Sequence, residues 1–277
     1  MVGPWELLVL GVGVLAAVML TWSIFKAAVN REEIDQWASR RGLTLTEQNS
    51  PVIADYLVRT RKYRLKGALI GLVIPFQLGV VGLEMALGYL LGALYAEFTQ
   101  ERPVDSGTRA ATLAPRSVED YLPSYVLVVL RAVSASMAVL MPLYLWGPAR
   151  EGSGAPQVSA ILGGAYAAVL PLVIEYLLRR MVAQPQPALS GDLLAADDAI
   201  RSSSIHAVAG AGACASMLLL GTFSAVTGLT SDITALRWIL PAFGAMAFAG
   251  GVAMWLTVGL TASWKVRRNF GSLGTQP

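Results

Sequence analysis

The sequence is poor in the residues on which most enzymes and soluble proteins depend. Only 14% of its 277 residues are charged, whereas a typical soluble domain has roughly 25%. It contains one histidine, His206, and one cysteine, Cys214, which excludes bis-histidine haem, an HExxH zinc motif and an internal disulfide. Neither a GxxxxGK[ST] nucleotide loop nor a GxSxG nucleophile motif is present. We therefore expect a protein that is not an enzyme and that binds no cofactor or metal.

Long apolar blocks are what the sequence has instead. Hydrophobic residues make up 55% of the chain, and the mean hydropathy is +0.57. An α-helix needs about 20 apolar residues to cross a membrane core of about 30 Å. Five blocks have this length: 5–28, 122–146, 157–180, 205–228 and 237–263. The sequence therefore predicts an all-α fold, a polytopic bundle of transmembrane helices that forms one domain over residues 1–277.

The basic residues between these blocks predict the orientation of the bundle, because cytoplasmic loops are enriched in lysine and arginine. Eighteen basic residues lie in the segments expected inside and two in those expected outside. The inner segments are 26–66, 98–121, 179–205 and the C-terminal tail, and the outer ones are 147–156 and 229–237. The first block is followed rather than preceded by basic residues, so we expect a retained span and not a cleaved signal. The N-terminus is then outside and the C-terminus inside.

A sixth block, residues 67–98, has inner segments on both sides and must enter and leave the membrane on the same side. Pro75 interrupts it, and the polar residues Gln77 and Glu84 flank the expected turn. Each arm has about fifteen residues, or about 23 Å of helix, which is short of the membrane core. We expect two short spans, and so about seven spans in total. A re-entrant hairpin is the alternative, and a single long crossing is a third interpretation that the charges disfavour.

Small residues are spaced four apart on both arms of this hairpin. Gly67 and Gly71 lie on the first arm, and Gly88 and Gly92, extended by Ala96, lie on the second. This spacing places them on one face of each helix and favours close helix packing.

The inner loop 30–66 is basic and is predicted to be helical. We expect a helix over 31–41 and a second one from Pro51, capped by Asn49 or Ser50. A DNA-binding helix pair is the alternative, but about 36 residues cannot bury an independent core, so we expect no nucleic-acid partner. We expect the loop to lie on the anionic headgroups of the lipid bilayer through Arg59, Arg61, Lys62, Arg64 and Lys66.

The inner loop 181–204 is expected to carry a short acidic helix that continues into the next block. Asp197 and Arg201 are four residues apart, in the favourable order for an ion pair. Asp197 and Asp198 could together hold Mg²⁺, but adjacent side chains on a helix point about 100° apart. We therefore expect a solvated helix face and not a metal site.

Charged residues within the apolar blocks are the candidates for function, because such residues usually face the bundle interior with a partner. Arg131 and Glu175 lie at compatible depths and are expected to pair. Glu84 and Gln77 lie near the hairpin turn. These residues form either part of a polar pathway for an ion or substrate, or a structural bridge between helices.

Several segments resemble those of a known family. They are "IDQWASRRGLTLT", "YLVRTRKYR", "GYLLGALYAEF", "PRSVEDYLPSY" and "DLLAADDAIRSSS". Together they are similar to an uncharacterised family of multi-pass integral membrane proteins from high-GC Gram-positive bacteria (actinobacteria). The resemblance implies a location in the plasma membrane and implies no activity.

Two functions remain as expectations. The first is a non-enzymatic accessory or scaffold subunit of a membrane complex, whose partner is another membrane subunit or an ATPase subunit. The alternative is a small transporter or channel whose polar pathway includes Arg131, Glu175 and Glu84, since broken helices at membrane depth often mark transport sites. A polar cavity lined by these residues favours transport, and a solid bundle favours a scaffold.

Overall fold

The computed structural model is all-α and describes residues 15, 18–19, 21–24, 28–73, 81–99, 117–146, 155–184 and 191–260. Its α-helices are α2 (Arg31–Arg40), α3 (Ser50–Val73), α4 (Val81–Phe98), α5 (Ser124–Trp146), α7 (Ala155–Ala183), α8 (Gly191–Leu229) and α9 (Thr234–Met254). A short 3₁₀ turn, η1 (Val118–Asp120), precedes α5, and a π-helical turn, η2 (Trp255–Leu260), follows α9. The predicted first span, 5–28, lies mostly outside the described residues.

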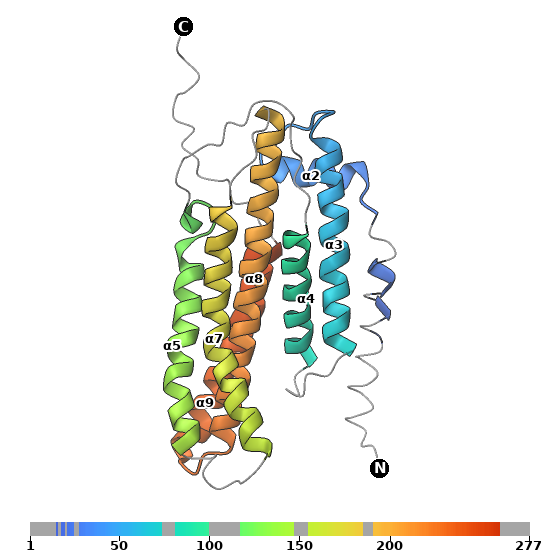
Figure 1. The fold of residues 1–277 in the computed structure, drawn as a ribbon. Coiled ribbons are helices and arrows are strands. Elements are labelled where there is room, and N and C mark those ends of the chain that lie inside the picture. Colours follow the sequence, from blue (N-terminus) through green and yellow to red (C-terminus); the bar gives the residue numbers. More distant parts are fainter. Residues whose placement is uncertain are drawn as a thin grey trace.

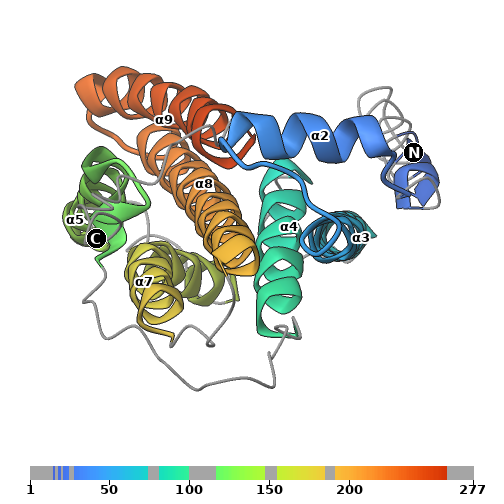
Figure 2. The same cartoon turned by 90° about the horizontal axis from the view of Figure 1, so that it is seen from above.

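Helix α8 lies at the centre of the bundle, with α4, α5, α7 and α9 around it and α3 outside α4 (Figures 1 and 2). Its middle reads "AVAGAGACAS", and all ten residues from Ala207 to Ser216 are buried. Small side chains let neighbouring backbones approach closely. Gly210 faces the backbone of η2, and Gly221 faces the backbone of α9 at Gly244. The small residues of α8 therefore allow four helices to pack around one.

From α3 to α9, consecutive helices run in opposite directions, and this places the helix ends that border the predicted inner segments 98–121 and 179–205 at one end of the bundle (Figure 1). The start of α3, the end of α4, the start of α5, the end of α7 and the start of α8 all lie at the upper end in this view. Residues 67–98 belong to two helices, α3 and α4, that pack side by side. This block therefore folds back as two packed helices and not as one long helix, and its first arm is the end of α3, which begins at Ser50.

The glycines of the hairpin explain how close these two helices lie. A side chain on Gly67 would overlap the backbone of Gly88 and Gly92, and one on Gly71 would overlap the backbone of Glu84. The order of these contacts is antiparallel. The predicted small-residue faces therefore meet in the structure with no side chain between the two backbones.

Three helical segments among the described residues are long and apolar enough to cross a membrane: Ser124–Leu143, Gly191–Leu229 and Thr234–Gly259. They correspond to the predicted blocks 122–146, 205–228 and 237–263. The chain is thus a multi-pass membrane protein by the length and composition of these helices. The predicted block 157–180 forms the 29-residue α7.

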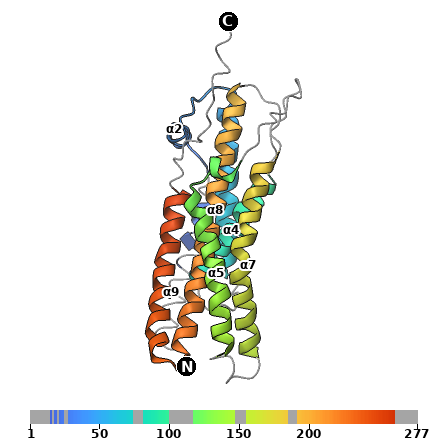
Figure 3. The same cartoon turned by 90° about the vertical axis from the view of Figure 1, so that its left-hand side faces the viewer.

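Helix α8 is much longer than a membrane span. It is 39 residues long, or about 58 Å at 1.5 Å per residue, and it projects beyond α5, α7 and α9 at one end (Figure 3). The prediction that the acidic helix continues into the next block is confirmed. That helix is not a separate short element, because it forms the first turns of α8.

Helix α2 lies across this projecting end rather than along the bundle (Figures 1 and 2). It begins where the Asn30 side chain accepts a hydrogen bond of 2.8 Å from the backbone N–H of Glu33, a typical N-cap. It ends at Arg40, and two residues later Gly42, with a φ of +65° in the left-handed region that favours glycine, turns the chain toward α3. The Asn49 side chain accepts a hydrogen bond of 2.8 Å from the backbone N–H of Thr46, so it orders the α2–α3 connection.

Candidate functional site

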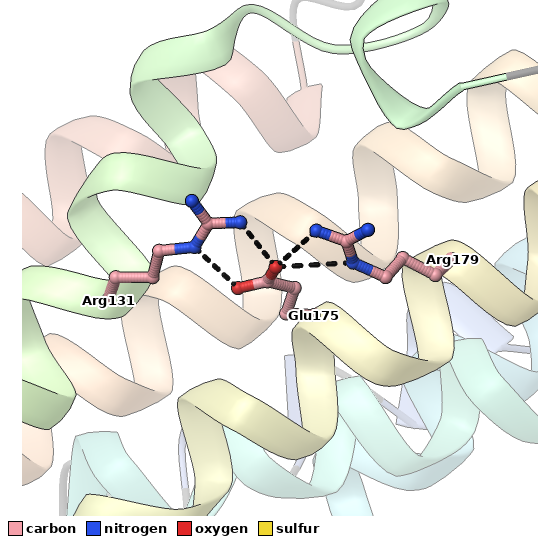
Figure 4. Close-up of polar contacts among 3 residues, drawn as sticks. All are labelled: Arg131, Glu175 and Arg179. Carbon is pink, nitrogen blue, oxygen red and sulfur yellow. Dashed lines mark hydrogen bonds and ion pairs between the residues drawn. The ribbon is translucent and has the colours of Figure 1, made fainter.

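Arg131, Glu175 and Arg179 form a charged cluster between α5 and α7 (Figure 4). Arg131 donates from Nε to Glu175 Oε2 at 3.0 Å and from Nη2 to Oε1 at 2.6 Å. Arg179 donates from Nε and Nη2 to the same Oε1 at 3.2 and 2.7 Å. The predicted pairing of Arg131 with Glu175 is confirmed. The structure adds that the pair is bidentate, which is the strongest geometry for an arginine and a carboxylate.

Arg179 is a member of the cluster that sequence reasoning missed as a partner. It lies one helical turn after Glu175, in the favourable order for an ion pair, and this spacing is the signal that could have revealed it. One carboxylate is thus shared by two guanidinium groups. The cluster carries a formal net charge of +1.

This cluster faces away from the bundle core, so the expectation that these charged residues face the bundle interior is wrong. The side chains of Arg131 and Arg179 are 55% and 56% exposed, whereas that of Glu175 is 13% exposed. Large apolar and aromatic side chains beside it are also exposed: Tyr125, Val128, Val169, Leu172 and Tyr176. We call the cluster and these five residues the α5–α7 face. It presents a positive centre within an apolar surface.

The cluster lies near the start of α5 and the end of α7, the ends that the basic segments predict to be inside. Arg131 is seven residues after the start of α5 and Arg179 is four residues before the end of α7, or about 10 and 6 Å along the helix axes. Long arginine side chains at this depth can reach the membrane interface while their carbon chains stay among apolar groups.

Glu84 lies apart from this cluster. It is in the first turn of α4, at the opposite end of the bundle from the cluster, and is only 5% exposed. Helix α4 packs against α3 and α8, whereas α5 and α7 pack against the other side of α8 (Figure 2). Gln77 lies outside the described residues. The structure therefore brings together Arg131 and Glu175 but not Glu84.

The five basic residues proposed as lipid contacts do not share one surface of α3. Lys62 and Lys66 are exposed, and Lys66 Nζ lies 5.7 Å from the centre of the Tyr63 ring. Arg59 donates to the backbone oxygen of Thr99 at 2.6 Å, and Arg61 pairs with Glu33 at 3.2 Å. Arg64 instead points inward, with its Nε shielded from solvent.

A second polar cluster, which sequence reasoning missed, is buried where α2 and α3 meet the start of α8. Arg41 donates to Ser203 Oγ at 3.2 Å, and the Tyr56 hydroxyl lies 3.3 Å from Ser204 Oγ. Tyr56, Thr60 and Arg64 follow one another at intervals of four on α3, which places them on one helical face. This interval, together with the "SSS" run of α8, was the available signal.

Arg201 joins this start of α8 to the end of α7. It is 1% exposed and donates from Nη1 to the backbone oxygens of Gln184 and Met181 at 2.7 and 3.3 Å. Its Nη2 lies 3.5 Å from Asp197 Oδ2. The predicted pair of Asp197 and Arg201 is confirmed, but the solvated helix face is wrong, because both aspartates, Asp197 and Asp198, are only 7% exposed.

Among the described residues, no three histidine, cysteine or acidic side chains lie close enough to hold a metal ion together. Asp197 has an arginine as its neighbour rather than a set of further oxygen ligands.

No protein-family model, no curated protein and no solved structure matches this chain. The resemblance drawn from the sequence segments therefore stays a prediction.

Proposed function

We propose that the chain is a non-enzymatic accessory or scaffold subunit of a plasma-membrane complex, and that the α5–α7 face binds its partner. The observation that carries this proposal is the outward position of the Arg131–Glu175–Arg179 cluster. The partner is another membrane protein, such as the membrane subunit of an ATPase, with a carboxylate on a membrane helix.

The electrostatics of the cluster support a protein partner. Charged groups inside a membrane are costly unless they are paired, and Glu175 can neutralise only one of the two guanidinium groups. Both arginines keep unused N–H donors, since each uses Nε and Nη2 for Glu175. A partner carboxylate beside them would balance the remaining charge, and the exposed apolar side chains around them would pack against its helix.

A polar transport pathway, the alternative function, has less support. It would need Arg131, Glu175 and Glu84 to line one route through the bundle. The first two face outward between α5 and α7, and Glu84 is packed in the hairpin on the other side of α8.

We also propose seven membrane segments, of which the α3–α4 hairpin is the shallowest. In Figure 1 the lower ends of α3 and α4 stop short of those of α5, α7, α8 and α9. Lys66 marks the last charge of α3, and only seven residues separate it from the end of that helix at Val73, or about 10 Å. Because this length is only about a third of a core of about 30 Å, two spans require Lys66 to lie inside the membrane segment, with its amine extended to the inner headgroups.

Cysteine labelling tests this topology. In a Cys214→Ala background, we expect a membrane-impermeant thiol reagent on intact cells to label outer positions and to spare inner ones. The outer positions are Val80, Gly152 and Asp232, and the inner ones are Leu45, Ala110, Ser190 and Phe270. Labelling at Ala110 would contradict the hairpin. Protection at Val80, with labelling at Gly152 and Asp232, would indicate a re-entrant hairpin in place of two spans.

Photo-crosslinking in native membranes tests the proposed function. A photoreactive residue at Val128 or Leu172 on the α5–α7 face should give one discrete protein adduct, because both side chains are exposed beside the cluster. The same residue at Ile239, which is 60% exposed on α9, serves as the control. We expect Arg131→Leu together with Arg179→Leu to abolish the adduct. Lipid adducts alone at all three positions would refute the scaffold function.

A further inference from the structure

We propose that Arg41 and Arg64, with the hydroxyl groups of Ser203, Ser204 and Tyr56, form a binding site for a phosphate group at the junction of α2, α3 and α8. This site is separate from the α5–α7 face and does not depend on the proposed function. Its ligand is either the phosphate of an anionic lipid headgroup or a free phosphate.

The local fold holds Arg41 in place at the end of α2. Gly42 reverses the chain directly after it, with backbone hydrogen bonds from Gly42 N to Ser39 O and from Leu43 N to Ala38 O. The Arg41 guanidinium stacks 4.0 Å from the centre of the Trp37 ring and donates to Ser203 Oγ. The stacking on Trp37 and the hydrogen bond to Ser203 thus hold the Arg41 guanidinium against α8.

Arg64 approaches the same place from α3. Side chains on a helix lean toward its N-terminus, so Arg64 points back along the face that carries Thr60 and Tyr56. The phenol groups of Tyr56 and Tyr89 lie beside its guanidinium group. Its Nε is buried and has no hydrogen-bond partner within the described part of the chain. Because buried N–H groups usually have a hydrogen-bond partner, the Arg64 Nε–H is available to a bound acceptor.

The charges at this site do not balance. Arg41 is close enough to Arg40 and Arg64 for their charges to act on it, and burial together with these two cations lowers the pKa of Arg41 to about 10. His206 of α8 also lies close to Arg41. Within the described residues, no carboxylate is among the groups that act on Arg41 or Arg64. The nearby Asp197 is paired with Arg201.

The donor set fits a phosphate better than a smaller anion. Two guanidinium groups supply charge and several N–H donors, and three hydroxyl groups lie between them, which suits an anion with three or four acceptor oxygens. Ser203 and Ser204 belong to the first half of α8, whose start projects beyond α5, α7 and α9 (Figure 3), and this end is near the depth expected for lipid phosphates of the inner leaflet. A bound anion would relieve the repulsion between Arg41 and Arg64.

The test uses the full-length protein and two probes. Thermal unfolding in detergent is measured with inorganic phosphate and with sodium chloride at matched ionic strength. Native mass spectrometry of protein released from nanodiscs then compares retention of phosphatidylglycerol with that of phosphatidylcholine. If inorganic phosphate raises the unfolding temperature more than chloride does, the ligand is a free phosphate. If phosphatidylglycerol is retained selectively and inorganic phosphate does not stabilise the protein, the ligand is a lipid headgroup.

The variants decide whether this site is responsible. We expect Arg41→Gln and Arg64→Gln each to weaken binding of the effective probe about tenfold or more, the usual loss for a hydrogen bond to a charged group. Arg31→Gln, which removes the same charge from an exposed position on α2, should leave binding unchanged. If Arg64→Gln does not fold, Arg64→Lys and Ser203→Ala replace it, and both should weaken binding. The proposal is refuted if neither probe binds, if the Arg41 and Arg64 variants bind as well as the unmodified protein, or if Arg31→Gln loses as much affinity as they do.

Discussion

Leucine in place of Gly88 is expected to force α3 and α4 apart and to lower the unfolding temperature markedly. A Cβ atom at this position would overlap the backbone oxygen of Gly67 and would lie 2.9 Å from the Cα and N atoms of Gly71. These neighbours are backbone atoms, which cannot rotate away as a side chain can. Overpacking typically costs about 1–3 kcal/mol and occasionally more, and a leucine at a backbone contact belongs in the upper part of this range.

Alanine in place of Gly88 distinguishes the effect of packing on stability from the effect of helix propensity. In an ordinary helix, replacing glycine with alanine stabilises by roughly 1 kcal/mol, so a loss of stability on Gly88→Ala can come only from the contact with α3. Gly191→Ala is the matched control, because a Cβ atom there would meet nothing within 4 Å. We expect Gly191→Ala to be neutral or slightly stabilising and Gly88→Ala to destabilise.

Two measurements check this expectation. Thermal unfolding in detergent reports stability, and spin labels at Ile70 and Leu91, both exposed on the hairpin, report the separation of α3 and α4 in a Cys214→Ala background. The distance between the labels should increase in Gly88→Leu. An unchanged distance and unfolding temperature would mean that the glycine contact does not hold the hairpin together.

The sequence predicted the hairpin because its determinants are local. Pro75 interrupts the apolar block, and glycines four residues apart mark one face of each arm. Basic segments on both sides require the chain to return to the same end. None of these signals depends on how distant helices pack, so the antiparallel contact of Gly67 with Gly88 follows from them directly.

The ion pairs were predictable, but their surroundings were not. The interval of four residues predicts the pair of Asp197 and Arg201, and matching depth predicts that of Arg131 and Glu175. Whether such a pair lies in the core or on the surface of the bundle depends on which elements cover it. Helix α2 lies across the projecting start of α8, and α3 packs beside it (Figure 2), so Asp197 is buried. No helix covers Arg131 in the described part of the chain, and its pair with Glu175 lies on the surface of the bundle. Nothing in the local sequence distinguishes these two outcomes.

Methionine in place of Arg201 is expected to be the most destabilising change at the end of the bundle where α7 ends and α8 begins. Arg201 is the side chain that satisfies the backbone oxygens of Met181 and Gln184 at the end of α7, where helix carbonyls lack partners of their own. Methionine has a similar length but no donor. The variant leaves these oxygens and the buried Asp197 without the arginine, and removing one partner of a buried ion pair costs about 3–5 kcal/mol.

Two further variants distinguish charge from geometry at this site. Arg201→Lys keeps the charge but cannot reach all three oxygens with a planar fork, so we expect an intermediate loss. Arg201→Met combined with Asp197→Leu removes both charges, and it should recover part of the stability because no lone buried charge remains. The carbonyls of α7 stay without donors in this double variant, so the recovery should be incomplete.

Arg180→Met is the matched control, because Arg180 is exposed near the same end of α7 and its guanidinium lies 5.9 Å from the Phe98 ring rather than in a buried ion pair. In unfolding by denaturing detergent, Arg201→Met should be much less stable than Arg180→Met, and Arg180→Met should be about as stable as the unmodified protein. Equal stability of the two variants would show that burial of Arg201 contributes nothing. The double variant lacks the donors to the helix carbonyls but has no Asp197 charge to pair. Its difference in stability from the unmodified protein therefore reports the contribution of the carbonyls, and its difference from Arg201→Met reports the cost of leaving Asp197 without its arginine.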